Sequence, residues 1–236
     1  MTNQLYANIE ISSILEQIQI IGPDSLSIIL LTAFCIGLIF SLQIIKEFLS
    51  LNAVHAIGSI ITISFIRELS PVLTSIILIG KIGSFFTSEL ATMQITEQID
   101  VLYILEIYPL PYLILPRVLA LIVLIPLLNI ISFFTSLFSS LFICFTIYNI
   151  DPYLFIISCY RNLFILDIMK SLLKCIIFGL GISIISCYVG IKTNGGAKGV
   201  GMSTTISVVT SLLFLFIVDF ILSYYMFDNI DRSFII

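Results

Sequence analysis

The sequence has little of what catalytic or nucleic-acid-binding proteins use. It contains one histidine and no tryptophan, and only 10% of its 236 residues are charged, with a net charge of −4. Because no basic stripe is available to neutralise phosphates, nucleic acid is excluded as a partner. No cluster of His, Asp or Ser indicates a membrane hydrolase or desaturase, so we expect no catalytic residue and no metal site.

Cysteine motifs and a phosphate-binding loop are also missing. The 5 cysteines are scattered through apolar stretches without CxxC spacing, which is typical of small packing residues. The glycine-rich stretch NGGAKGVG at 194–201 lacks the Lys-Ser/Thr ending of a GxxxxGK[ST] loop. We therefore expect no cofactor in this chain, and any energy that it uses must come from outside it.

Long apolar runs dominate what is present. Hydrophobic residues make up 59% of the chain, against about 45–50% in soluble domains. A membrane-spanning helix needs about 20 apolar residues. Uncharged runs occupy residues 25–45, 48–66, 118–150, 175–191 and 199–218. The pattern predicts an all-α integral membrane protein with about five transmembrane helices, forming a single domain over 1–236.

The first 22 residues differ from these runs. They carry Glu10 and Glu16 but no Lys or Arg, and they lack a small-residue cleavage site, so we expect no cleavable signal. We predict instead an amphipathic helix over 1–22 that lies at the membrane interface. Its buried side would consist of Ile9, Ile14, Ile18 and Ile21.

Charge interrupts the second apolar run at Arg67 and Glu68. The helix is predicted to continue to Gly80, because the residues from 70 onward are apolar again. Pro71 can be tolerated where neighbouring helices satisfy the freed backbone groups. An ionisable residue inside a membrane is costly and usually faces a cavity or a partner. An internal salt bridge that holds helix packing and a substrate path both remain open.

Between the second and third predicted spans, residues 92–108 turn polar. Treated as one helix, this segment places three apolar side chains on one face: Ile95, Ile99 and Leu102. Glu97 and Asp100 then point away from that face. The prolines that follow cannot lie inside a regular helix, so they end the segment. It is either a solvated loop helix without a partner or a docking helix for another protein.

Three charged residues mark the approach to the fourth span. Lys170 and Lys174 stand at i and i+4, and Asp167 lies three residues before Lys170, which supports a helix start. We expect the lysines to anchor this helix at the membrane interface. Attraction to lipid head groups is the alternative.

Several stretches carry a family signature. GKIGSFFTSELATMQITEQID at 80–100 and YLILPRVLA at 112–120 are followed in order by DIMKSLLKCIIFGL at 167–180 and GGAKGVGMSTTISVV at 195–209. IRELSP precedes them at 66–71, and VDF follows at 218–220. Together they resemble the MlaE-type permeases, the membrane subunits of ABC lipid transporters in bacterial and plastid envelopes.

The resemblance implies roles for named residues. In that family the segment after the second membrane helix is a coupling helix that sits in a groove of the ATPase subunit. It therefore assigns ATPase contact to four residues of the 92–108 region: Thr96, Glu97, Gln98 and Asp100. It also implies that three residues lie beside the lipid path: Gln43, Arg67 and Glu68.

The same resemblance implies function and partners. The chain would be a permease subunit that moves phospholipid or a related lipid across or between envelope membranes, powered by ATP bound to a separate ATPase subunit. It would pair with a second copy of itself and with a lipid-binding MCE-type substrate protein. The alternative is a membrane carrier or scaffold that works without an ATPase, which would leave the docking segment unexplained.

Location and orientation are expectations of the same kind. A chain rich in Ile, Phe, Asn and Tyr suits an AT-rich genome such as that of a plastid. We expect the plastid (chloroplast) inner envelope membrane, with a bacterial inner membrane as the alternative. The family likeness implies an N-terminus on the ATPase side and a C-terminus on the opposite side.

Overall fold

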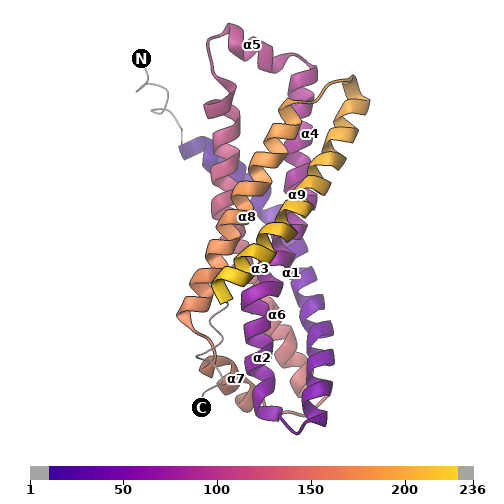
Figure 1. The fold of residues 1–236 in the computed structure, drawn as a ribbon, viewed down its shortest axis with the longest axis vertical. Coiled ribbons are helices and arrows are strands. Elements are labelled where there is room, and N and C mark those ends of the chain that lie inside the picture. Colours follow the sequence, from indigo (N-terminus) through magenta and orange to yellow (C-terminus); the bar gives the residue numbers. More distant parts are fainter. Residues whose placement is uncertain (1–10, 228–236) are drawn as a thin grey trace. The chain divides into compact units, whose positions relative to one another are not determined.

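The computed structural model describes residues 11–227, and all regular secondary structure in that range is helical (Figure 1). Among these residues, five stretches are long and apolar enough to cross a membrane: Ser13–Ser50, Val54–Ile95, Leu110–Thr146, Ile165–Ile191 and Gly196–Met226. The predicted all-α membrane protein with five spans is therefore confirmed. Each span overlaps one of the five uncharged runs of the sequence.

The second span is built from several helical pieces. In chain order they are η2 (Val54–Ala56), α2 (Ile57–Ser64), η3 (Phe65–Leu69), α3 (Ser70–Leu78), η4 (Ile79–Gly83) and α4 (Ser84–Ile95). Of these, η3 and η4 are single π-helical turns. The other helices of the described residues are α1 (Ile11–Ser50), α5 (Gln98–Ile104), η5 (Leu110–Ile114), α6 (Leu115–Thr146), α7 (Pro152–Arg161), α8 (Ile165–Ile191) and α9 (Gly196–Phe227).

Helix α1 begins earlier than the first uncharged run and contains Pro23. Residues 11–22 are its first turns, so the described part of the predicted N-terminal helix is continuous with the first span. Ile21 is buried and Ile14 and Ile18 are half-buried, so these isoleucines pack against the protein. Ile9 lies outside the described residues. The interfacial position of this segment stays a prediction.

The described chain forms two compact units, each assembled from three separate stretches. Unit 1 contains residues 11–25, 75–125 and 176–220, whereas unit 2 contains residues 26–74, 126–175 and 221–227. Every span contributes residues to both units. The predicted coupling segment belongs to unit 1, and the charged residues of the second and fourth spans belong to unit 2.

Unit 2 has an apolar core formed by α1, α2, η3, α6 and α7. Ten buried residues make it up: Ile45, Ile57, Ile61, Phe65, Ile66, Phe133, Ile143, Cys144, Ile150 and Phe155. Gly58 allows α2 to approach α7, because a Cβ there would collide with Ser158 and with the carbonyl of Phe155. Asp151 caps α7 by accepting a hydrogen bond from the Tyr153 N–H at 3.1 Å.

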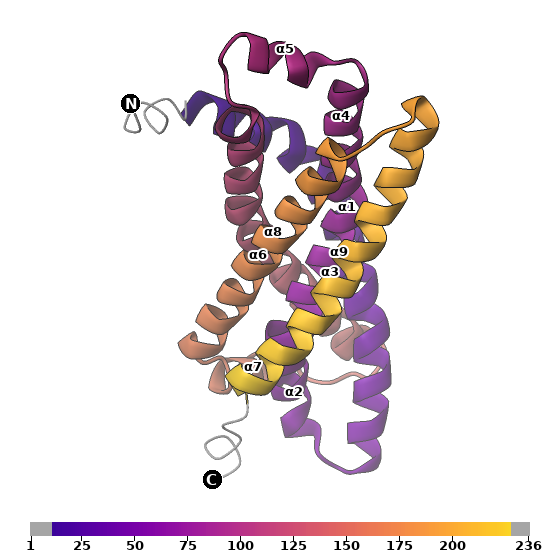
Figure 2. The same cartoon turned by 45° about the horizontal axis from the view of Figure 1, so that its top comes forward.

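Buried hydroxyl groups join the helices of unit 1, where α4 packs against α8 and α9 (Figure 2). Thr87 Oγ1 on α4 lies 3.1 Å from the Ser186 carbonyl oxygen of α8 and 2.7 Å from Ser207 Oγ of α9. Gly190 permits the approach of α8 to α4, since a Cβ there would press on Thr87 and Leu90. Lipid is as apolar as Leu, so spans associate through such small residues and hydrogen bonds.

Candidate functional site

The connection from α4 to α6 carries the four residues expected to contact an ATPase. Thr96 Oγ1 donates to the Thr92 carbonyl oxygen at 2.9 Å and closes the last turn of α4. Glu97 then takes left-handed backbone angles, with φ 59° and ψ 13°, before α5 begins at Gln98. A second left-handed residue, Glu106, has φ 61° and follows the end of α5.

These left-handed residues correct the prediction of one helix over 92–108. A residue with φ > 0 cannot continue a right-handed helix, so the chain turns sharply at Glu97. Ile95 closes α4 and Ile99 lies in the first turn of α5, so the two do not share a helix face. The segment is the end of α4 followed by a short helix that connects to α6 (Figure 2).

Some side chains of this connection are buried and hold it in place, whereas others are exposed on its surface. Ile99 is buried at 3% exposure and fixes α5 to its own unit. The four predicted contact residues are all exposed: Thr96, Glu97, Gln98 and Asp100. Apolar side chains are exposed beside them, and Ile104 reaches 81% and Leu105 61%. The connection therefore presents a mixed acidic and apolar surface, which we call the α5 surface.

An ion pair lies beneath the α5 surface. Glu89 on α4 and Arg117 on α6 meet at 2.9 Å, and the Arg117 side chain is only 4% exposed. The guanidinium lies 5.7 Å from the centroid of the Phe86 ring, within range of a cation–π contact. This pair joins the two helices that flank α5. The sequence around Arg117 gave no indication of this partner, so the pair was not predicted.

A second set of charges lies in unit 2. Arg67 Nη2 is 3.2 Å from Asp167 Oδ2, and Lys174 Nζ is 2.9 Å from Glu68 Oε2. We call these four residues the charge cluster. The sequence alone indicated an ion pair at this depth, but the structure pairs Arg67 and Glu68 each with an opposite charge on α8. These partners lie 100 and 106 residues further along the chain.

The helical spacing of α8 explains the charge cluster. Asp167, Ser171 and Lys174 fall at i, i+4 and i+7, so they share one face of the helix. Ser171 continues the polar stripe, because its Oγ accepts a hydrogen bond from Asn129 Nδ2 of α6 at 3.0 Å. Asn129 Oδ1 in turn accepts from Ser70 of α3 at 2.7 Å. Three helices are thus held together by one polar stripe.

Lys174 also satisfies the backbone beside Pro71. Proline has no N–H, so it cannot donate to the carbonyl of the residue four positions earlier, Arg67. Lys174 Nζ donates to this oxygen at 3.2 Å and also reaches Ser223 Oγ of α9 at 2.8 Å. The prediction that a neighbouring helix satisfies the backbone at Pro71 is confirmed.

The predicted interfacial anchoring by the lysines is wrong for Lys174, whose side chain is 0% exposed. A buried ammonium needs several oxygen acceptors, and it finds them on two neighbouring helices. Lys170 donates to the Met226 carbonyl oxygen at 2.6 Å, at the C-terminal end of α9. A cation is favourable there because the carbonyls of the last turn lack intrahelical donors.

Comparison with known proteins decides the family. A family model described as Permease MlaE matches residues 14–225. The chain belongs to the MlaE permease family. Its sequence is 51% identical over 222 residues to a "Probable ABC transporter permease protein" of Pyropia yezoensis, covering 94% of this chain and 84% of that protein.

Two less similar relatives also match more than nine-tenths of this chain. A "Probable ABC transporter permease protein" of Synechocystis is 43% identical over 215 residues, covering 91% of this chain and 82% of that protein. The protein TRIGALACTOSYLDIACYLGLYCEROL 1, chloroplastic, of Arabidopsis thaliana is 42% identical over 219 residues, covering 93% of this chain and 63% of that protein. This MlaE family member is thus an integral membrane permease of an ABC transporter, which implies an ATPase partner.

The predicted lipid-path residues of this permease all lie in unit 2. Arg67 and Glu68 form part of the charge cluster, whereas Gln43 is exposed on α1 and makes no side-chain hydrogen bond with any described residue. The structure therefore brings two of the three to a common cluster. Sequence reasoning missed Ser223 and the roles of Asp167 and Lys174. The i, i+4, i+7 stripe on α8 was the signal that could have found the latter two.

Proposed function

We propose that this MlaE permease moves phospholipid or a related lipid across or between envelope membranes, with energy from a separate ATPase. The charge cluster carries the proposal, because charges inside a spanning segment are costly and are retained where they line a substrate path. Asp167 and Lys174 are 7% and 0% exposed, whereas Arg67 and Glu68 keep 26% and 42% exposure. An anionic head group can therefore reach the Arg67 guanidinium.

In this proposal, the α5 surface docks on the ATPase. Thr96, Glu97, Gln98 and Asp100 would meet basic and polar groups of the partner, and the exposed Ile104 would enter an apolar groove. ATP is bound by the ATPase and not by this chain. Movement of the docked α5 would pass to the spans through the two helices that flank it.

The assembly and location complete the proposal. Two copies of the permease would work with two ATPase subunits and an MCE-type lipid-binding protein, and the N-terminus would lie on the ATPase side. The likeness to a chloroplastic relative supports a plastid inner envelope membrane. A bacterial inner membrane is the alternative that the Synechocystis relative supports.

The docking test is co-purification of the permease in detergent with each ATPase of the compartment in which the permease is found. Wild type should capture one ATPase, and Glu97→Lys with Asp100→Lys should lose it through charge reversal on the α5 surface. The control carries Glu16→Lys and Glu47→Lys, which reverse two exposed acids outside this surface. A folded wild-type protein that captures no ATPase would favour a carrier or scaffold that works without one.

The lipid test uses proteoliposomes that contain the captured ATPase and a fluorescent phospholipid. Arg67→Gln should reduce ATP-dependent lipid transfer about tenfold, the effect of losing about 1.4 kcal/mol, while ATPase capture is kept. Because this change leaves Asp167 without the guanidinium, Arg67→Gln with Asp167→Asn tests the same loss without an unpaired carboxylate. Unchanged transfer in both variants would remove Arg67 from the lipid path.

A further inference from the structure

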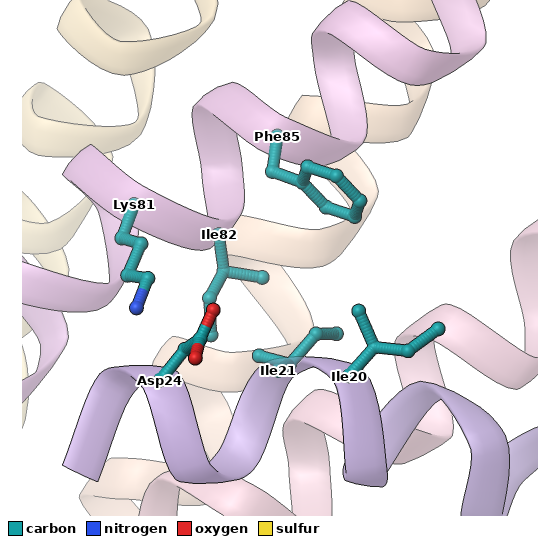
Figure 3. Close-up of a pocket in the computed structure, with 6 residues that line it drawn as sticks. All are labelled: Ile20, Ile21, Asp24, Lys81, Ile82 and Phe85. Atoms are coloured by element: carbon teal, nitrogen blue, oxygen red, sulfur yellow. The ribbon is translucent and has the colours of Figure 1, made fainter.

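A cleft in unit 1 shares no residue with the charge cluster or with the α5 surface. It has a volume of about 160 Å³ and lies between α1 and the η4–α4 part of the second span. Figure 3 shows the Lys81 ammonium and the Asp24 carboxylate pointing toward one another at one end. The rest of its lining is apolar: Ile20, Ile21, Ile82 and Phe85.

The sequence places this charged end at a membrane boundary. Asp24 stands directly before the uncharged run 25–45, and Lys81 directly after the uncharged stretch 69–80. Consecutive spans run in opposite directions, so the start of the run 25–45 in the first span and the end of the stretch 69–80 in the second span reach the same side of the membrane. Acidic and basic side chains at such a boundary lie at the level of the lipid head groups.

We propose that this cleft binds the head group of a zwitterionic phospholipid. Its two opposite charges match a ligand that carries a phosphate and an ammonium a few bonds apart. The phosphate would lie on Lys81 and the ammonium between Asp24 and the ring of Phe85, whose face attracts a cation. The acyl chains would extend into the hydrocarbon region, along the uncharged parts of the two spans.

The size and lining of the cleft favour this ligand over other membrane lipids. Pockets that enclose a whole drug-sized ligand have about 300–1,000 Å³, so this cleft holds a head-group fragment. A lipid with an anionic head group and no ammonium would satisfy Lys81 but would bring its phosphate close to the Asp24 carboxylate. The isoleucines and Phe85 suit the methyl groups of choline better than the hydroxyls of a glycerol or sugar head group.

The test is native mass spectrometry of the full-length permease in detergent, titrated separately with phosphatidylcholine, phosphatidylethanolamine and phosphatidylglycerol. Wild type should hold the first two more tightly than the third. Asp24→Asn should weaken both zwitterionic lipids about tenfold, because the ammonium loses its charged acceptor, and should leave phosphatidylglycerol unchanged or tighter. Lys81→Gln should weaken all three.

Two further variants separate lipid binding from a merely structural role of Asp24 and Lys81. Phe85→Leu keeps the apolar packing but removes the ring, so it should weaken phosphatidylcholine about threefold or more through loss of the cation–π contact. Lys198→Gln removes an exposed charge of the same unit and should change no affinity. Equal affinity of wild type for the three lipids, or equal losses in Asp24→Asn for all three, would overturn the proposal. The inference requires only a membrane-embedded chain, so the loss of ATPase capture or lipid transfer would leave it standing.

Discussion

Replacing Lys174 by Met removes the most buried charged side chain among residues 11–227. The ammonium is 0% exposed and has acceptors at 2.9 Å on Glu68, 2.8 Å on Ser223 and 3.2 Å on the Arg67 carbonyl. Breaking a buried ion pair from one side costs about 3–5 kcal/mol. Glu68 is 42% exposed and still accepts from Ser223 at 2.9 Å, so we expect the lower limit, about 3 kcal/mol. The carbonyl beside Pro71 loses its donor as well.

The measurement is reversible unfolding in mixed micelles with increasing SDS, followed by far-UV circular dichroism. Glu68→Met should cost more than Lys174→Met, because it leaves a fully buried ammonium without its carboxylate. The double variant should lose at least about 2 kcal/mol less than the sum of the two single changes, as expected for residues in contact. Lys198→Met is the exposed control and should stay within about 0.5 kcal/mol of wild type. Additive losses, or a wild-type curve for Lys174→Met, would refute this account of the charge cluster.

Three other outcomes follow from separate parts of the structure. A Cβ at Gly181 would overlap the Phe214 ring, so Gly181→Ala should cost about 1–3 kcal/mol in the same unfolding measurement, and a stability equal to wild type would contradict that close approach. Arg117→Met removes the ion pair with Glu89 beneath the α5 surface, so it should preserve ATPase capture but lower ATP-dependent transfer about tenfold or more; equal loss of capture and transfer would assign the pair to docking instead. Burial raises the pKa of the Cys159 thiol in α7 above its ordinary value of 9.0, so in a variant with no other cysteine its alkylation should rise through a midpoint above pH 9.0, and a lower midpoint would contradict the burial.

The class of the protein could be predicted from the sequence because hydrophobicity along a single helix is a local property. Five uncharged runs correspond to five spans, and the stretch from 80 to 120 carries the family likeness that the comparison confirms. The need to satisfy the backbone at Pro71 was equally local, since it depends on the missing N–H of one residue. The residue that satisfies it was not predictable from the local sequence.

The spacing of charged residues along the sequence did not predict their ion-pair partners, because packing between distant segments decides which charges meet. The interval of three residues from Asp167 to Lys170 suggested helix-start support, yet Asp167 meets Arg67, 100 residues earlier in the chain. Desolvation explains this outcome, because a charge inside a spanning segment must find an opposite charge on whichever helix packs against it. Sequence spacing gives the face of a helix but not the helix that this face contacts.

The α5 surface also has one property that the local sequence predicts and one that depends on the surrounding structure. The sequence pattern predicted that Glu97 and Asp100 point away from the apolar face, and their exposure agrees with that prediction. Their contact with an ATPase was implied by the family resemblance and stays a prediction. The break at Glu97 was not predicted, because a non-glycine residue takes φ 59° only where the surrounding structure compensates its strain. The sequence by itself determined the spans and the family, through local hydrophobicity and motif order. Only the tertiary structure decided the ion pairs, the turn at Glu97 and the cleft of Asp24 and Lys81, because each depends on contacts or backbone geometry that no local pattern encodes.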